Sequence, residues 1–211
     1  MGIHWNILDE ERKNILPPLS VFAESGFYLA GGTGLALQLG HRDSIDFDFF
    51  KEGDFDTSLL ISKLEDVFKE YKIEITQNEK NTISCVLNST IQLSFFGFKY
   101  KTLKPFIETD YFKIASIEDI ACMKFGAIMS RSLEKDYVDL YFILQLFNLK
   151  DLINLCKEKY LNIDSTLILK SLTYFDDIKK EPILFKENHE VSLPVIEKFL
   201  EQKVKEYFIN L

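Results

Sequence analysis

The sequence predicts an α+β fold, because strand-like patterns occupy its first half and helical patterns fill its second half. Runs of apolar or alternating residues between positions 72 and 98 have the period of β-strands. Apolar residues between positions 117 and 208 recur at helical spacing instead. A doubly wound parallel sheet would need helices and strands that alternate along the whole chain. We therefore expect an α/β lobe over residues 1–115 and a helical lobe over residues 116–211.

Composition and charge support a folded protein and narrow its partners. The chain has 211 residues, of which 46% are hydrophobic and 27% are charged, and this excludes a disordered or collagen-like protein. The net charge of −8 disfavours broad binding to nucleic-acid backbones, although a local basic groove is compatible with it. The three cysteines lie far apart and form no CxxC pair, so we expect buried free thiols. Because no leader and no run of about 18 apolar residues is visible, we expect a cytoplasmic protein that does not associate with membranes.

The first 50 residues contain two predicted helices and two predicted strands. Residues 8–25 have a helical pattern that is interrupted or restarted at two prolines, and residues 27–30 form a short apolar strand. A second helix over residues 33–39 has Thr33 as its expected N-cap and Gly40 as its stop. Residues 45–49 alternate between apolar and acidic side chains, which is the period of a strand with one buried face.

The remaining elements follow from the same periodicities. Residues 56–71 have the apolar spacing of an amphipathic helix. Three strands are expected over residues 72–76, 82–87 and 90–98, and Asn88-Ser89 is the expected hairpin turn between the last two. Ser116 begins a capping-box pattern, which predicts the start of a helix. Helices are expected near residues 117–131, 134–147, 150–160, 164–174 and 193–208.

Two glycines and two aspartates form the most informative pattern. Gly31-Gly32 lies at a strand-to-helix junction, where the free N–H groups of a helix N-terminus can approach a phosphate, and the Thr33 hydroxyl adds a donor. Asp46 and Asp48 are two apart on a strand, so both carboxylates project from one face. Converging carboxylates repel each other unless a cation lies between them. Hard oxygen ligands suit Mg²⁺ or Mn²⁺, and Mg²⁺ is typically held by one or two carboxylates together with substrate phosphates.

Each of these features also has a purely structural alternative. An alternating Asp/Phe strand is compatible with an edge strand that has a solvated acidic face, and two glycines are compatible with an ordinary tight turn. Their occurrence together, with thirteen residues between the second glycine and Asp46, favours a phosphate cradle that faces a divalent-metal site.

This combination resembles the signature of the DNA polymerase β-like nucleotidyltransferases. The longer stretch over residues 29–50 resembles a narrower group, the AbiEii/AbiGii-type nucleotidyltransferases, many of which are toxins of bacterial toxin–antitoxin pairs. Residues 116–120 and 135–141, with Lys124 and Arg131 between them, resemble the later helical motifs of that group. The resemblance covers about residues 27–145.

The resemblance implies a polymerase β-like mixed sheet with flanking helices. It further implies an enzyme that binds a nucleoside triphosphate (NTP) with Mg²⁺ or Mn²⁺, transfers a nucleotidyl group to an acceptor such as tRNA, and has a cognate antitoxin as its protein partner. It places the catalytic residues at Asp46, Asp48, Lys124 and Asp136, with Asp46 and Asp48 as the metal ligands. It places the nucleotide-binding residues at Gly31, Gly32, Thr33, Arg42, Ser44, Arg131 and Lys135.

The basic residues of the second half also make sense without the resemblance. Lys124 and Arg131 are two helical turns apart, so they share a face from which they can offset the charge of a triphosphate. The alternative is a solvated helix face with ordinary ion pairs to Asp136 or Asp139. We expect Asp136 to orient Lys124 or Arg131 rather than to bind the metal. His41 is expected either to contact phosphate or to complement a helix dipole.

One position departs from the polymerase β-like pattern. Active enzymes of that superfamily usually carry a third carboxylate on a later strand, and here Ser94 aligns with it. A serine cannot take up a proton near neutral pH or hold a metal as a carboxylate does. Glu74 on a neighbouring strand is a candidate substitute. The departure keeps two alternatives open, a nucleotide-binding protein with lost or weak catalysis that acts through a protein partner, and a purely structural protein.

A small basic–aromatic cluster follows the last strand. Lys99 and Lys101 alternate with Phe98 and Tyr100, and Lys104 lies just beyond them. Such a cluster can steer the acceptor end of an RNA and offer a ring for stacking, and the alternative is a solvated loop.

Overall fold

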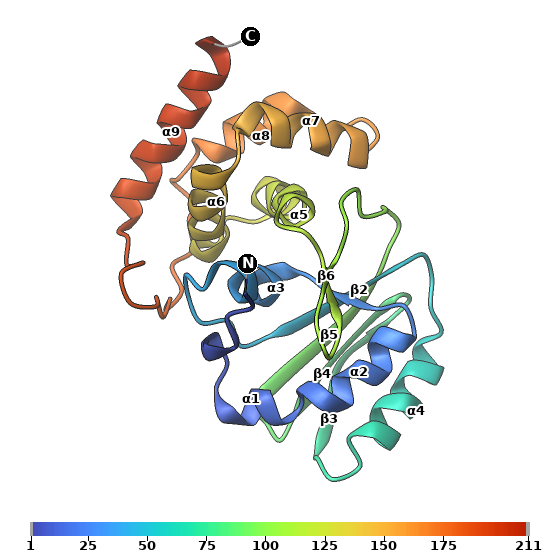
Figure 1. Cartoon of the computed structure of the whole chain (residues 1–211). Coiled ribbons are helices and arrows are strands. Elements are labelled where there is room, and N and C mark those ends of the chain that lie inside the picture. The colour runs from blue at the N-terminus through green and yellow to red at the C-terminus, as the bar shows by residue number, and fades with distance from the viewer. Residues whose placement is uncertain (1, 210–211) are drawn as a thin grey trace.

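The computed structural model describes residues 2–209 and consists of a mixed β-sheet with helices on both faces (Figure 1). In this part of the chain the sheet has seven strands in the order β3-β4-β5-β2-β1-β7-β6. The strands are β1 (Tyr28–Leu29), β2 (Phe47–Glu52), β3 (Ile73–Glu79), β4 (Thr82–Leu87), β5 (Ile91–Phe98), β6 (Ile107–Glu108) and β7 (Lys113–Ile114). The predicted α+β class is therefore confirmed.

The helices divide between the two faces of the sheet. Those of the N-terminal part are η1 (Trp5–Ile7), α1 (Glu10–Asn14), α2 (Leu16–Glu24), α3 (Gly31–Leu39) and α4 (Thr57–Val67). Those of the C-terminal part are α5 (Ile117–Ser130), α6 (Glu134–Leu146), α7 (Leu149–Lys159), α8 (Ser165–Leu172) and α9 (Leu193–Ile209). In Figure 1, α1, α2 and α4 lie below the sheet and α5 to α9 lie above it. Within residues 2–209, no helix is long and apolar enough to cross a membrane.

Strand β2 occupies a central position because both of its faces are used. Phe47 and Phe49 are fully buried against the hydrophobic core beneath the sheet, as the alternating pattern predicts. Asp48 therefore points to the opposite face, toward α5 and α6. Strand β2 pairs antiparallel with β1 and parallel with β5, and the second register places Asp48 directly beside Ser94.

Local signals account for most of the helix boundaries. Ser116 accepts a hydrogen bond from the Asp119 N–H at 3.0 Å, which confirms the predicted cap of α5. Gly40 ends α3 with a φ of +65°, as expected for a glycine stop. Asn88 and Ser89 both have positive φ in the β4–β5 turn, the conformation of a tight two-residue hairpin.

Several expectations need correction. Helix α3 begins at Gly31 rather than at Thr33, and its N-cap is Ala30, so the prediction of Thr33 as N-cap is wrong. Strand β2 begins at Phe47, so Asp46 lies just before the strand. Strands β6 and β7 were not predicted, because two residues each are too short for a periodicity.

Hydrophobic side chains form two clusters. One lies between the sheet and α1, α2 and α4, and the other lies among α5 to α9. Cys85, Cys122 and Cys156 are buried within these clusters as free cysteines, as predicted. The division of the chain after residue 115 stays a prediction.

Candidate active site

A cleft with a volume of about 1320 Å³ separates the upper face of the sheet from α5 and α6. Its floor includes Asp48 and Ser94, and its roof includes Lys124 and Arg131. A segment between α8 and α9 closes one side, where Glu181 lines the cleft. The cleft therefore brings together residues that are more than 130 positions apart in sequence.

The turn between β1 and α3 approaches Asp48 and Arg42 so closely that it needs glycine. Gly31 has a φ of +64°, and a Cβ atom there would lie 2.7 Å from Oδ2 of Asp48. A Cβ atom on Gly32 would lie 2.7 Å from Nη2 of Arg42. Any side chain at these two positions would collide with a charged group. The N-terminus of α3, with its unpaired backbone N–H groups, is thus held directly against Asp48.

The electrostatics of Asp48 favour a bound cation. Burial raises the pKa of Asp48, and the neighbouring Asp46 raises it further, while Lys124, Arg131 and Lys135 lower it. Two carboxylates in this arrangement repel each other, and a divalent cation would relieve the repulsion. Within residues 2–209, no group of three or more His, Cys, Asp or Glu side chains could hold a metal ion. Asp46 and Asp48 match in number the one or two carboxylates that Mg²⁺ commonly takes together with phosphate oxygens.

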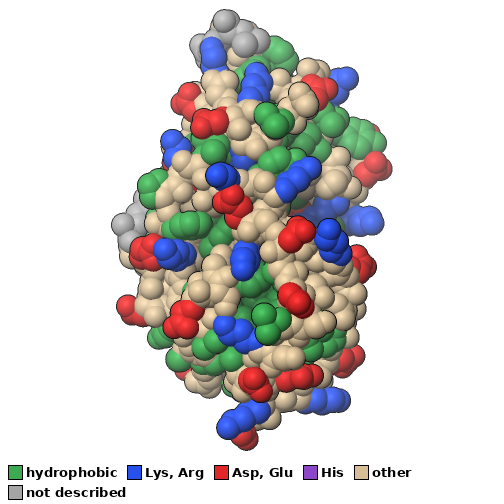
Figure 2. Space-filling model, turned by 90° about the vertical axis from the view of Figure 1, so that its right-hand side faces the viewer, with side chains coloured by type: hydrophobic (Ala, Val, Ile, Leu, Met, Phe, Trp, Pro, Cys, Tyr) green, Lys and Arg blue, Asp and Glu red, His purple; other side chains and the backbone are tan. Residues whose placement is uncertain are grey.

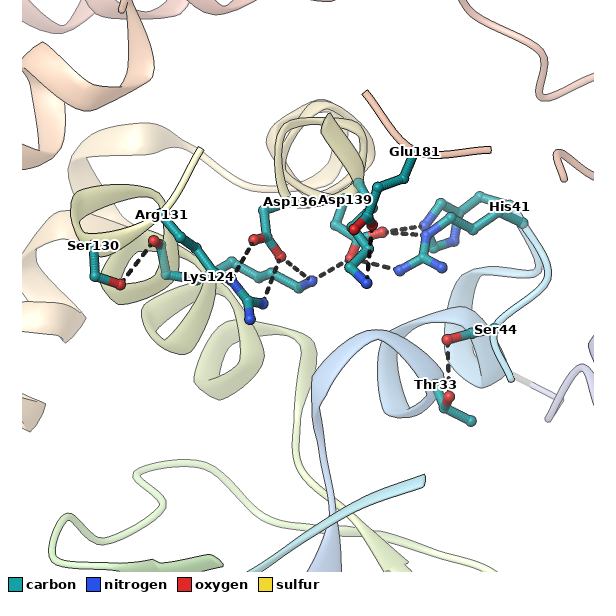
Figure 3. A network of polar contacts seen from close by, with 12 residues as sticks. Thr33, His41, Ser44, Lys124, Ser130, Arg131, Asp136, Asp139 and Glu181 are labelled. Carbon is teal, nitrogen blue, oxygen red and sulfur yellow. Dashed lines mark hydrogen bonds and ion pairs between the residues drawn. The ribbon is translucent and has the colours of Figure 1, made fainter. Parts of the chain in front are cut away.

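A buried ion-pair network forms the roof of the cleft and joins α5, α6 and the loop that follows α3 (Figure 3). Lys124 donates to Asp136 at 2.7 Å and lies 2.5 Å from Oδ2 of Asp139. Arg42 donates to both oxygens of Asp139, at 2.8 and 2.9 Å. Although burial lowers the pKa of Lys124, Asp139 and Asp136 outweigh this and raise it, so the ammonium stays charged. Lys124 is therefore buried in a network rather than placed on a solvated helix face.

Two cations at the outer end of the roof are more accessible. The side chain of Arg131 is 54% exposed, and its Nε donates to Asp136 at 3.1 Å. Lys135 forms an ion pair with Glu181 at 3.1 Å, and both of these side chains are about one-third exposed. Asp136 thus binds both Lys124 and Arg131, which matches the expectation that it orients these cations.

Comparison with known proteins identifies the family. The family model described as nucleotidyl transferase AbiEii toxin, type IV toxin–antitoxin system, matches residues 19–207. The chain belongs to this family. An uncharacterized protein from Aquifex aeolicus is 40% identical over 207 residues, which cover 95% of this chain and 97% of the relative.

Solved structures share the fold of this AbiEii-family protein at low sequence identity. MenT4, a nucleotidyltransferase toxin from Mycobacterium tuberculosis, matches with a TM-score of 0.64 and 12% identity, covering 95% of this chain and 82% of that one. JHP933 from Helicobacter pylori matches with a TM-score of 0.58 and 17% identity, covering 99% of this chain and 94% of that one. These matches support the fold and say nothing of individual residues.

Thr33 and Ser44, two of the expected nucleotide-binding residues, fix the loop before β2 in this AbiEii-family protein. The Thr33 side chain is buried, and its hydroxyl donates to the backbone carbonyl of Asp46. The Ser44 hydroxyl lies 2.8 Å from that of Thr33. These contacts hold the loop before β2 against α3, so Thr33 positions Asp46 instead of offering its hydroxyl to a ligand.

The position of the expected third carboxylate is neutral in this AbiEii-family protein. Ser94 lies beside Asp48 in the sheet, and its hydroxyl is 3.2 Å from that of Ser84 on β4. Glu74 is exposed on β3, three strands away from β2, or about 14 Å at the usual strand spacing. Glu74 therefore cannot replace the missing carboxylate next to Asp48.

Sequence reasoning did not include two central members of the network among the site residues. Asp139 is fully buried and binds Arg42 and Lys124 together. His41 is also fully buried, with Nε2 at 2.8 Å from Asp139, so its ring belongs to the network and is closed off from a phosphate in the cleft. The sequence named Asp136 and Asp139 as alternative ion-pair partners of Lys124 and Arg131, but no local signal pointed to the contact between Asp139 and Arg42.

Proposed function

We propose that this protein binds an NTP with Mg²⁺ (or Mn²⁺) and transfers its nucleotidyl group to an acceptor hydroxyl, with tRNA as the acceptor class. One observation carries the proposal. Asp48 lies against the glycine turn at the N-terminus of α3, with the charge of Asp46 acting on it, in a cleft whose roof supplies Lys124, Arg131 and Lys135. As an AbiEii-family protein, it would act as the toxin of a toxin–antitoxin pair, with a cognate antitoxin as its partner.

Each part of the cleft has a role in this chemistry. The oxygen of the acceptor hydroxyl attacks the α-phosphorus and its proton passes to solvent water, the bond from that phosphorus to the bridging oxygen breaks, and pyrophosphate leaves. The N–H groups at the start of α3 would donate hydrogen bonds to phosphate oxygens, while Arg131 and Lys135 would offset the charge of the departing pyrophosphate. Asp46 and Asp48 would hold Mg²⁺, which neutralises phosphate charge when bound. Such a reaction depends on positioning and electrostatics, which a network of buried ion pairs is suited to supply.

The test is transfer of label from NTPs that carry ³²P at the α-phosphate. The purified protein is incubated with each of the four labelled NTPs, Mg²⁺ and total tRNA, alongside the variants Asp46→Ala and Asp54→Ala. Asp54 is a matched control, because its side chain is 73% exposed and does not line the cleft. We expect labelled RNA from the wild type and Asp54→Ala, and none from Asp46→Ala. Equal labelling by wild type and Asp46→Ala would exclude the proposal.

A second candidate is nucleotide binding with lost or weak catalysis, in which the protein acts through a protein partner. The neutral Ser94 favours it, because no carboxylate occupies this position of β5 beside Asp48 to receive the proton of the acceptor. Calorimetry that detects Mg²⁺-dependent NTP binding, combined with no transfer to any RNA in the labelling assay, would select this candidate.

A further inference from the structure

The cleft has a second region that the proposed chemistry does not use. Aromatic side chains continue along the floor beyond the aspartates, and all of them line the same cleft. Phe50 follows Asp48 by two residues on β2, and Phe96 follows Ser94 by two residues on β5. Because side chains alternate along a strand, both rings lie on the same face as Asp48, about 6.5 Å further along. Unlike the fully buried phenylalanines below the sheet, Phe50 and Phe96 are only half-buried.

These rings belong to a continuous aromatic wall, which we define as Phe50, Phe96, Phe98, Tyr100 and Tyr160. The ring centroids of Phe50 and Phe96 are 5.1 Å apart, and those of Phe50 and Phe98 are 5.7 Å apart. Tyr100 lies 5.4 Å from Phe98 and 4.6 Å from Tyr160. The wall therefore reaches from the sheet to the residue that follows α7.

Buried polar contacts fix the loop that carries Tyr100. Asp119, in the first turn of α5, accepts hydrogen bonds from the backbone N–H groups of Leu103 and Lys104, at 3.0 and 2.9 Å. Lys159 donates to Asp119 and to the carbonyl of Lys101, each at 2.6 Å. The side chains of Asp119 and Lys159 are each only 1% exposed. The wall is therefore held in place before any ligand arrives.

The aromatic wall and the phosphate-binding cations lie at opposite ends of the cleft. Asp119, which anchors the wall, is at the beginning of α5, and Arg131 follows its end. Twelve residues of helix separate them by about 18 Å. The parallel strands β2 and β5 run from the phosphate end of the cleft to the aromatic end, because Asp48 and Ser94 come before Phe50 and Phe96 along them. One end of the cleft is thus cationic and the other is aromatic.

We infer that the aromatic wall is the subsite for the nucleobase of the bound NTP, which stacks on Phe96 and Tyr100. An NTP has this same polarity, with all of its negative charge at one end and a flat ring at the other. An RNA strand would need cations along its backbone. Near the wall, however, Lys159 is paired with the buried Asp119, the exposed Lys101 lies 3.7 Å from Glu52, and the exposed Lys99 lies over the ring of Tyr100. None of these three lysines lines the cleft, so within residues 2–209 the wall offers an RNA backbone no row of cations inside it. The inference rests on the proposed binding of NTP.

Calorimetry can separate the two ends of the ligand. The dissociation constants (Kd) of ATP and of inorganic tripolyphosphate, both with Mg²⁺, are measured for the wild type and for Phe96→Leu and Tyr100→Leu. Leucine keeps an apolar side chain and removes the ring. Tyr111→Leu is the matched control, because Tyr111 is also half-buried but lies outside the cleft, against Trp5. If Phe96→Leu does not fold, Tyr100→Leu serves alone, since it lies in a loop outside the sheet.

We expect the wild type to bind ATP more tightly than tripolyphosphate. Each cleft variant should weaken ATP binding by about 5- to 150-fold, the range for base–aromatic stacking, and leave tripolyphosphate binding unchanged. The inference is wrong if the wild type binds both ligands equally, or if the variants affect both alike. It is also wrong if the variants bind ATP normally and lose tRNA, which would assign the wall to the acceptor. If the wild type binds neither ATP nor tripolyphosphate, the proposed function itself fails.

Discussion

Asp139 makes the strongest test of the buried network, because it joins three basic side chains and is fully buried. Its carboxylate lies 2.8 Å from Nε2 of His41, receives two hydrogen bonds from Arg42, and is 2.5 Å from Nζ of Lys124. Burial by itself raises the pKa of Asp139, but Arg42 and Lys124 outweigh it and hold the pKa well below its ordinary value. The Asp139 carboxylate is therefore charged at neutral pH.

Asp139→Asn keeps the shape of the side chain and removes its charge. The new amide group donates hydrogen bonds, so it would face the donors of Arg42 or Lys124. A hydrogen bond to a charged group contributes about 1.5–3 kcal/mol, and simple addition over four contacts would give about 6–12 kcal/mol. Such contributions are not additive, and removal of one partner from a buried pair costs about 3–5 kcal/mol in practice. We expect Asp139→Asn to lower the free energy of unfolding by about 3–5 kcal/mol at pH 7.

Urea unfolding followed by circular dichroism measures this change. The control is Glu108→Gln, which breaks an ion pair with Lys113 whose side chains are 52% and 68% exposed. The control should change the free energy of unfolding by less than about 1 kcal/mol. A loss for Asp139→Asn as small as that of the control would refute the account of the network.

The effect of Asp139→Asn should also depend on pH. The folded state has a lower pKa for Asp139 than the unfolded state, whose value is about 3.9. The stabilisation is therefore fully present above that value and is lost as the pH falls through the folded-state pKa. The difference in the free energy of unfolding between the wild type and Asp139→Asn should become smaller below about pH 4, provided that both proteins remain folded there. A constant difference down to pH 3 would contradict the assignment.

Three further predictions concern single contacts around the cleft. Gly31→Ala places a side chain at positive φ and 2.7 Å from Asp48, so it should destabilise the protein by about 1–2 kcal/mol in urea and weaken Mg²⁺-dependent ATP binding in calorimetry. Burial lowers the pKa of His41 in the folded protein below its value of about 6.5 in the unfolded chain. As the pH falls below about 6.5, the unfolded chain therefore takes up a proton at His41 before the folded protein does, and the free energy of unfolding decreases. His41→Gln should therefore flatten the decrease in urea stability between pH 7 and pH 5. Glu181→Gln frees Lys135 from its ion pair and should tighten ATP binding up to about fivefold, as measured by calorimetry.

Each of these predictions has a contrary outcome. Gly31→Ala with wild-type stability and ATP binding would show that the turn tolerates a side chain beside Asp48. An unchanged pH slope in His41→Gln would mean that other groups cause the loss of stability. Weaker ATP binding by Glu181→Gln would mean that the carboxylate contributes to the site rather than competing with phosphate.

The sequence predicted well those elements whose bounds depend on residues close together in the chain. Helices α5 to α9 begin and end within two residues of the predicted bounds, because caps and helical apolar spacing are local signals. The helix cap at Ser116, the helix stop at Gly40 and the turn at Asn88 all occur where these residue types predict them. Strands β6 and β7 were missed because their two residues each are defined by pairing with distant strands.

The residues of the candidate site also fall into those that the sequence predicted and those that only the structure could place. The glycine pair and the two aspartates could be named from the sequence, because the glycines stand at a strand-to-helix junction and the aspartates in an alternating stretch thirteen residues later. Thr33 was expected to meet a ligand, and only the packing of α3 against the loop before β2 shows its hydroxyl bound to the backbone of Asp46. Glu74 was a candidate for the third carboxylate until the strand order placed it three strands from β2.

The sequence by itself determined the class of fold, the family, and the presence of an acidic pair behind a glycine turn, since these depend on residue types at short separations. The tertiary structure alone decided which charges meet. Asp139 meets Arg42 across 97 positions, and Glu181 meets Lys135 across 46, because α6 packs against α3 and the segment between α8 and α9 pairs with the start of α6. Charge and ring contacts in a cleft depend on how separate elements pack against one another, and that geometry follows from burial of the two hydrophobic clusters rather than from any local pattern.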